Sequence, residues 1–85
     1  MIKLFTDNAW NDYLYWQQTD KQMVKRINKL IKSIEREGFS YGIGKPEPLK
    51  HDLRSYWSRR INDEHRIIYK IDDEKLVITS CKDHY

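Results

Sequence analysis

Two groups suited to proton transfer and base stacking stand at the end of the chain, the imidazole of His84 and the phenol of Tyr85. They follow residues 75–82, a run typical of a β-strand. Chain ends usually fray unless the fold holds them, so a solvated tail also explains these two residues. Their role depends on which other groups the fold places beside them.

A carboxylate that could act as a base lies between two prolines. Glu47 is flanked by Pro46 and Pro48, and each proline fixes its own φ and restricts the residue before it. Cleavage of a phosphodiester by an attacking ribose 2′-hydroxyl needs a base, a cation against the developing charge and an acid for the leaving oxygen. Glu47, Arg66 and His84 could fill these three roles.

Other interpretations of these residues stay open at the level of sequence. Glu47 could be an ordinary surface carboxylate, Arg66 a cross-strand ion-pair partner and the histidines unrelated surface groups. Arg59 and Arg60 are adjacent on a predicted strand, so they fall on opposite faces and only one can readily face the open side of a sheet. Arg60 could then be a solvated strand residue.

Composition predicts one small domain spanning residues 1–85. The net charge of +3 permits an anionic partner without requiring one. The single Cys81 cannot form an intramolecular disulfide, and His51, His65 and His84 lack the paired spacing of zinc sites. Because the chain contains no apolar stretch of the length of a signal peptide or membrane span, we expect a soluble, reduced, cytoplasmic protein without a membrane partner.

The first half of the chain predicts one strand and two helices. Residues 2–5 alternate like a strand, and Thr6 or Asp7 can cap a following helix with Trp10, Tyr13 and Leu14 on one face. Thr19 and Gln22 have the spacing of a capping box for a second helix, which Gly38 ends. The apolar residues of this helix follow the 3.6-residue period: Met23, Ile27, Leu30, Ile31 and Ile34.

The second half predicts strands. Residues 39–49 contain glycines and prolines and predict an ordered loop, after which residues 53–61, 65–71 and 75–82 predict strands, with a hairpin turn at residues 72–74. The predicted fold class is α+β, a short strand and two helices followed by a three-stranded antiparallel meander. The helices pack on one face of the sheet, and we expect function on the other.

Five segments of the chain carry a resemblance to a known family. They are GKPEPLKH at residues 44–51, WSRRI at 57–61, EHRIIY at 64–69, CKDHY at 81–85 and WNDYLYW at 10–16. In these motifs the chain resembles the YoeB/Txe branch of the RelE-type toxins over essentially its whole length. The resemblance implies a RelE-like, microbial ribonuclease-type fold and a toxin of a bacterial type II toxin–antitoxin module. The implied activity is endoribonucleolytic cleavage of mRNA in the ribosomal A site, which inhibits translation.

The resemblance also assigns roles to individual residues. It implies Glu47 as the general base, Arg66 as the arginine that stabilises the transition state, His84 as the general acid and Tyr85 as a catalytic or base-stacking aromatic. Two positions, Lys50 and Arg60, match those that hold phosphate or stabilise charge. Three more are assigned to RNA or ribosome contact: Lys45, His51 and Arg59. No metal ion or other cofactor is implied, because proton transfer and guanidinium stabilisation suffice for this reaction.

The implied partners are mRNA in the A site of the 70S ribosome, a YefM/Axe-like antitoxin that wraps the toxin, and a second copy of the chain in a homodimer. An alternative from another class is a basic RNA- or ribosome-binding module without catalysis. In that module lysines and arginines contact phosphates, and Tyr56, Trp57 and Tyr85 provide stacking surfaces.

Overall fold

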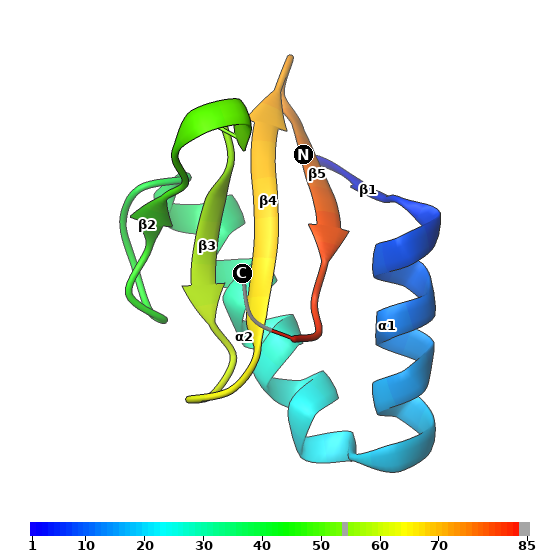
Figure 1. The fold of residues 1–85 in the computed structure, drawn as a ribbon. Helices are drawn as coiled ribbons and strands as arrows, with labels where there is room; N and C mark the ends of the chain where they lie inside the picture. Colours follow the sequence, from blue (N-terminus) through cyan, green and yellow to red (C-terminus); the bar gives the residue numbers. More distant parts are fainter. Residues whose placement is uncertain (54, 84–85) are drawn as a thin grey trace.

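A computed structural model describes residues 1–53 and 55–83. It confirms the α+β class: a five-stranded mixed sheet in the order β1-β5-β4-β3-β2 has its two helices on one side (Figure 1). The elements in chain order are β1 (Ile2–Phe5), α1 (Asp7–Thr19), α2 (Lys21–Glu37), β2 (Glu47–Pro48), a 3₁₀ helix (His51–Leu53), β3 (Trp57–Arg60), β4 (Arg66–Asp72) and β5 (Lys75–Ser80).

The antiparallel meander of β3, β4 and β5 is confirmed, and one further strand lies at each edge of it. β1 pairs parallel with β5, from Ile2 opposite Lys75 to Phe5 opposite Ile78. β2 pairs antiparallel with β3 within a segment for which the sequence predicts only a loop. A strand of two residues is too short to show an alternating pattern, so its pairing is visible only in the sheet.

The strand predicted from residue 53 begins later, at Trp57. Leu53 is the last residue of the 3₁₀ helix, and its carbonyl accepts the Tyr56 amide at 2.9 Å. The Leu49 amide in turn donates to the Tyr56 carbonyl at 2.9 Å. These bonds close a compact connection between β2 and β3 and leave β3 with four residues.

Local side chains define the helix starts. Thr6 caps α1 by accepting the Ala9 amide, as one of the two expected caps. The predicted capping box at Thr19 is wrong, because Asp20 is the extended residue before α2 and accepts the Gln22 amide at 3.0 Å. Thr19 instead donates its hydroxyl to the Tyr15 carbonyl within α1.

The core lies between α2 and the sheet. All five predicted apolar residues of α2 are buried, and they form one cluster with buried side chains of β4 and β5, namely Ile67, Tyr69, Leu76 and Ile78. In α1 the buried residues are Ala9 and Trp16, whereas Trp10, on the face predicted to carry Tyr13 and Leu14, remains 47% exposed. Trp10 lies instead in an aromatic group with Phe5 and Tyr13 near the sheet edge.

The predicted hairpin between β4 and β5 is also confirmed. Asp73 and Glu74 both have positive φ, 52° and 63°, as a two-residue hairpin loop requires to follow the twist of its strands. No helix among residues 1–53 and 55–83 is long and apolar enough to cross a membrane.

Candidate functional site on the open face of the sheet

The strand register brings three of the predicted site residues to one face. Glu47 lies opposite Ser58, Ser58 opposite Ile68, and Arg60 opposite Arg66. Cross-strand partners share a face and every second residue returns to it, so Glu47, Arg60 and Arg66 project together. From the usual spacings of strands and residues, the Cα atoms of Glu47 and Arg66 are roughly 12 Å apart. Long side chains can converge on one phosphate across this distance.

This face is opposite the helices. Arg59 and Ile67, the cross-strand pair adjacent to Arg60 and Arg66, are fully buried on the helix side. Arg60 and Arg66 are partly exposed, and Glu47 is exposed in β2. The two arginines and the carboxylate, which are candidate site residues, therefore lie on the helix-free face.

Arg60 and Arg66 form a cross-strand pair of like charge. Such a pair destabilises a sheet, and none of the ion pairs found within residues 1–53 and 55–83 includes either arginine. Nη1 of Arg66 donates to the carbonyl oxygens of Asn62 at 2.8 Å and His65 at 3.2 Å, which orients the guanidinium. A bound phosphate would offset the repulsion between the two cations.

The Nε atom of Arg60 is buried and forms no hydrogen bond within the described part of the chain. Lys45 lies with Arg60 along a hollow of about 330 Å³, which Arg26 and Asp63 also line. The Arg60 amide donates to the Gly44 carbonyl at 2.7 Å and so holds the backbone just before Lys45 against the end of β3.

Lys50, expected to hold phosphate or stabilise charge, and His51, expected to contact RNA or the ribosome, are exposed in the connection after β2. His51 has a positive φ of 61°, an uncommon conformation for a residue with a Cβ atom. The two side chains therefore extend the basic surface beyond the strand that carries Glu47.

Arg59, expected to contact RNA or the ribosome, is fully buried, and this placement contradicts the expectation. Its guanidinium donates five hydrogen bonds of 2.7–3.1 Å inside the protein. The acceptors are Tyr69 Oη, Ser33 Oγ and the carbonyl oxygens of Gly38, Tyr41 and Ile43. Because all three of its nitrogens bond to these acceptors, Arg59 holds the loop after α2 to the sheet rather than reaching a ligand.

The aromatic residues expected to stack on bases also differ in placement. Trp57 lies on the helix side and packs against Phe39, with ring centroids 5.3 Å apart, so it is not part of the open face. Tyr56 lines a shallow hollow with Ile68 and Ser80, and the Lys70 ammonium lies 5.1 Å from its ring centroid.

The segment after β5 is held by side chains that sequence reasoning did not identify. The Cys81 amide donates to Asp12 Oδ2 at 3.0 Å, Trp16 Nε1 donates to the Cys81 carbonyl at 2.8 Å, and the Asp83 amide donates to His65 Nδ1 at 2.8 Å. Burial raises the pKa of Asp12, although the Cys81 hydrogen bond opposes this shift. No local pattern reveals these contacts, because they join residues 18 to 69 positions apart.

The predicted acid His84 and the predicted aromatic Tyr85 lie outside the described residues. Asp83 directly precedes His84, and it is the last residue whose position is described. Within residues 1–53 and 55–83, no group of three or more His, Cys, Asp and Glu side chains lies close enough to hold a metal ion.

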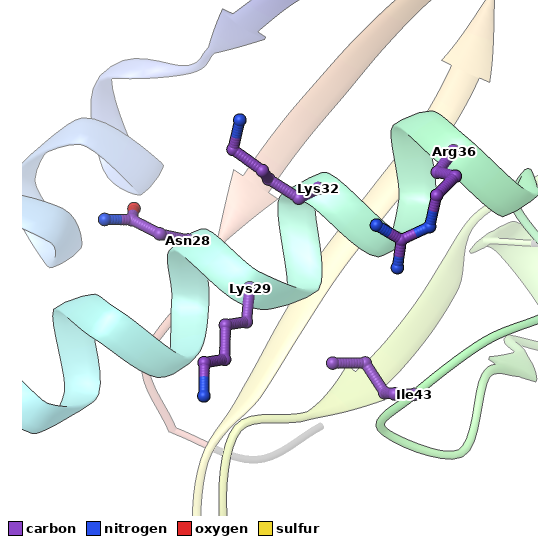
Figure 2. A pocket seen from close by; sticks show the side chains of 5 residues that line it. All are labelled: Asn28, Lys29, Lys32, Arg36 and Ile43. Atoms are coloured by element: carbon purple, nitrogen blue, oxygen red, sulfur yellow. The ribbon is translucent and has the colours of Figure 1, made fainter.

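A second basic hollow lies on α2, away from the carboxylate. Its volume is about 350 Å³, and it is lined by Asn28, Lys29, Lys32, Arg36 and Ile43. In Figure 2 the side chains of Lys29 and Arg36 extend from α2 to the side on which the loop residue Ile43 lies. Its lining contains cations and an amide but no carboxylate or imidazole, so it can attract an anion but offers no carboxylate base.

Comparison with known proteins identifies the family. Residues 5–85 match the model of the YoeB-like toxins of bacterial type II toxin–antitoxin systems. Toxin YoeB of Escherichia coli K12 is 54% identical over 85 residues, which cover 100% of both chains. The structure of the YoeB dimer from Staphylococcus aureus superposes with a TM-score of 0.95 at 55% identity and covers 100% of this chain and 98% of that one.

A heterotetrameric YoeB-YefM toxin–antitoxin complex from Staphylococcus aureus contains a chain of similar fold. That chain superposes with a TM-score of 0.93 at 55% identity, again over 100% of this chain and 98% of the other. Family, sequence and fold comparisons thus agree over the same residues, and the chain belongs to the YoeB-like toxins of bacterial type II toxin–antitoxin systems.

Proposed function

We propose that this toxin is a metal-independent endoribonuclease that cleaves mRNA in the A site of the 70S ribosome. The observation that carries the proposal is the register that projects Glu47, Arg60 and Arg66 from one helix-free face. A base and two cations around one phosphate are the groups that attack by a neighbouring 2′-hydroxyl requires.

In the proposed reaction Glu47 removes the proton from the ribose 2′-hydroxyl, and that oxygen attacks the adjacent phosphorus. Arg66, with Arg60 and Lys50, stabilises the negative charge that develops on the phosphate oxygens. The bond to the 5′-oxygen breaks, and His84 donates a proton to this leaving oxygen. One product carries a 2′,3′-cyclic phosphate, which a water molecule can hydrolyse to a 3′-phosphate, and the other carries a 5′-hydroxyl.

The remaining predicted residues act in binding. Tyr85 stacks on a base beside the cleaved bond, and the exposed Lys45 and His51 contact RNA or the ribosome. Net charge of +3 favours such contacts with phosphate, so ribosome binding should weaken as salt rises.

We further infer an antitoxin partner and a homodimer for this chain in the cytoplasm. The support is similarity: the Staphylococcus aureus relative is described as a YoeB dimer and as a heterotetrameric complex with YefM. Measurement of mass in solution, alone and with a YefM-like protein, tests both assemblies. A monomer at micromolar concentration that forms no complex with that protein would contradict them.

Primer extension on a defined mRNA tests the catalytic proposal, with purified ribosomes present or absent. We expect cuts at A-site codons only with ribosomes, and losses of roughly a hundredfold or more in Glu47→Gln and His84→Ala. Glu74→Gln is the matched control, because this exposed carboxylate lies in the β4–β5 hairpin, outside the catalytic set.

Three results would contradict parts of the proposal. Cleavage without ribosomes contradicts the A-site requirement, and full cleavage by Glu47→Gln contradicts its role as base. Ribosome binding without any cleavage by the unchanged chain would favour the non-catalytic RNA-binding module.

A further inference from the structure

His65 makes contacts that none of the proposed catalytic roles uses. Its side chain is only 13% exposed and packs edge-on against Trp16, with ring centroids 4.8 Å apart. Its Nδ1 accepts the Asp83 amide at 2.8 Å, so this nitrogen carries a lone pair and no proton. In the neutral ring the proton is therefore on Nε2, which lies 4.0 Å from Glu64 Oε1.

Both backbone groups of Asp83 bond to the start of β4. Its amide donates to the His65 ring, and its carbonyl accepts the Arg66 amide at 2.9 Å. Asp83 has a φ of 68°, in the left-handed region, where a residue with a Cβ atom needs surrounding contacts to hold it. The hydrogen bond from Asp83 to His65 provides such a contact.

The backbone of His65 also orients Arg66, the proposed transition-state arginine. The His65 carbonyl accepts Nη1 of Arg66 at 3.2 Å, and His65 directly precedes Arg66 in the chain. His65 therefore contacts both the residue before the proposed acid and the proposed transition-state arginine. A displacement of about 1 Å between such groups can lower a rate roughly a hundredfold.

We propose that His65 is a positioning residue: through its Nδ1 it holds Asp83, and so sets the point from which His84 extends, relative to Arg66. The catalytic part of this inference rests on the proposed ribonuclease function. The structural part, a side chain that holds the segment after β5, does not depend on it.

The substitutions His65→Asn and His65→Gln differ in how far the side-chain amide oxygen lies from Cβ. In His65→Asn the amide oxygen is two bonds from Cβ, like Nδ1, so it can still accept the Asp83 amide. In His65→Gln the oxygen is one bond further, like Nε2. Both variants lose the imidazole packed on Trp16, so a general loss of packing affects both.

Amide hydrogen exchange by NMR tests the structural part without any substrate. We expect the Asp83 amide to exchange about tenfold faster in His65→Gln than in the unchanged chain, and to remain protected in His65→Asn. In the unchanged chain the ¹⁵N resonance of Nδ1 should be that of a non-protonated ring nitrogen. Equal exchange of the Asp83 amide in both variants would overturn the proposal.

The cleavage assay tests the positioning role. We expect His65→Gln to lower kcat roughly ten- to hundredfold with KM nearly unchanged, and His65→Asn to restore most of the rate. Faster Asp83 exchange with normal cleavage would overturn the positioning role. No cleavage by the unchanged chain would overturn the ribonuclease function, while the exchange comparison would still decide whether His65 holds Asp83.

Discussion

Replacement of Arg59 tests how the fold holds the loop that leads to Glu47. Of its five acceptors, Ser33 Oγ and Tyr69 Oη belong to fully buried residues, whereas the three carbonyls belong to residues that are partly or largely exposed. A hydrogen bond to a charged group contributes about 1.5–3 kcal/mol, so loss of these two bonds costs about 3–6 kcal/mol. A domain of 85 residues has a free energy of unfolding of about 4–13 kcal/mol.

We therefore expect Arg59→Ala to lose about a third to two thirds of the stability of a domain near the middle of this range. Arg59→Lys should lose less, because an ammonium has three donors on a single nitrogen and can replace only part of the planar guanidinium. The order of stability should be unchanged chain, Arg59→Lys, Arg59→Ala.

Urea unfolding followed by tryptophan fluorescence measures these differences, since Trp57 packs on Phe39 of the same loop. Arg36→Ala is the matched control, because that arginine is 71% exposed and its replacement should change stability by less than about 0.5 kcal/mol. A loss below about 1 kcal/mol in Arg59→Ala would refute the argument that the buried hydrogen bonds hold this loop.

The further predictions concern Gly44 and Cys81. Gly44 has a φ of 85°, and a Cβ there would lie 2.6 Å from Leu30 Cδ2. Gly44→Ala should therefore lower the free energy of unfolding by about 1–3 kcal/mol more than Gly38→Ala, where a Cβ meets no atom within 4 Å. Equal urea midpoints for the two variants would contradict this. Burial raises the pKa of Cys81 to about 12, so iodoacetamide should label it far more slowly in the folded chain than in urea. Because the pKa of Cys81 in the folded chain exceeds the ordinary value of 9.0, its contribution to the free energy of unfolding is complete below about pH 9 and is lost as pH rises toward about 12. A urea midpoint that depends equally on pH in Cys81→Ala would contradict this.

Local patterns account for the parts of the fold that could be predicted. The period of α2 identified its buried stripe, Gly38 its end, and the alternation of the later strands the meander with its hairpin. The motif resemblance identified the family, which the comparisons confirm over residues 5–85. For the helix, its end and the strands, the signal lies within one helix, one strand or one turn, where neighbouring residues determine the conformation.

The candidate site could be predicted only in part, because strand periodicity is also a local signal. The period of two places Arg59 and Arg60 on opposite faces, but it does not say which face the helices cover. Packing decided this: Arg59 is buried against the loop after α2, and Arg60 faces the open side opposite Arg66. The same pattern is compatible with the reverse assignment.

The sequence by itself determined the two helices, the three strands of the meander, the fold class, the family and the identity of the groups able to transfer protons. Only the tertiary structure decided that β1 lies parallel to β5, that Glu47 pairs with Ser58, and that His65 holds Asp83. These contacts join residues from 11 to 73 positions apart. Their formation depends on how the whole chain buries its apolar surface and satisfies its backbone hydrogen bonds, and no local run of residues encodes that arrangement.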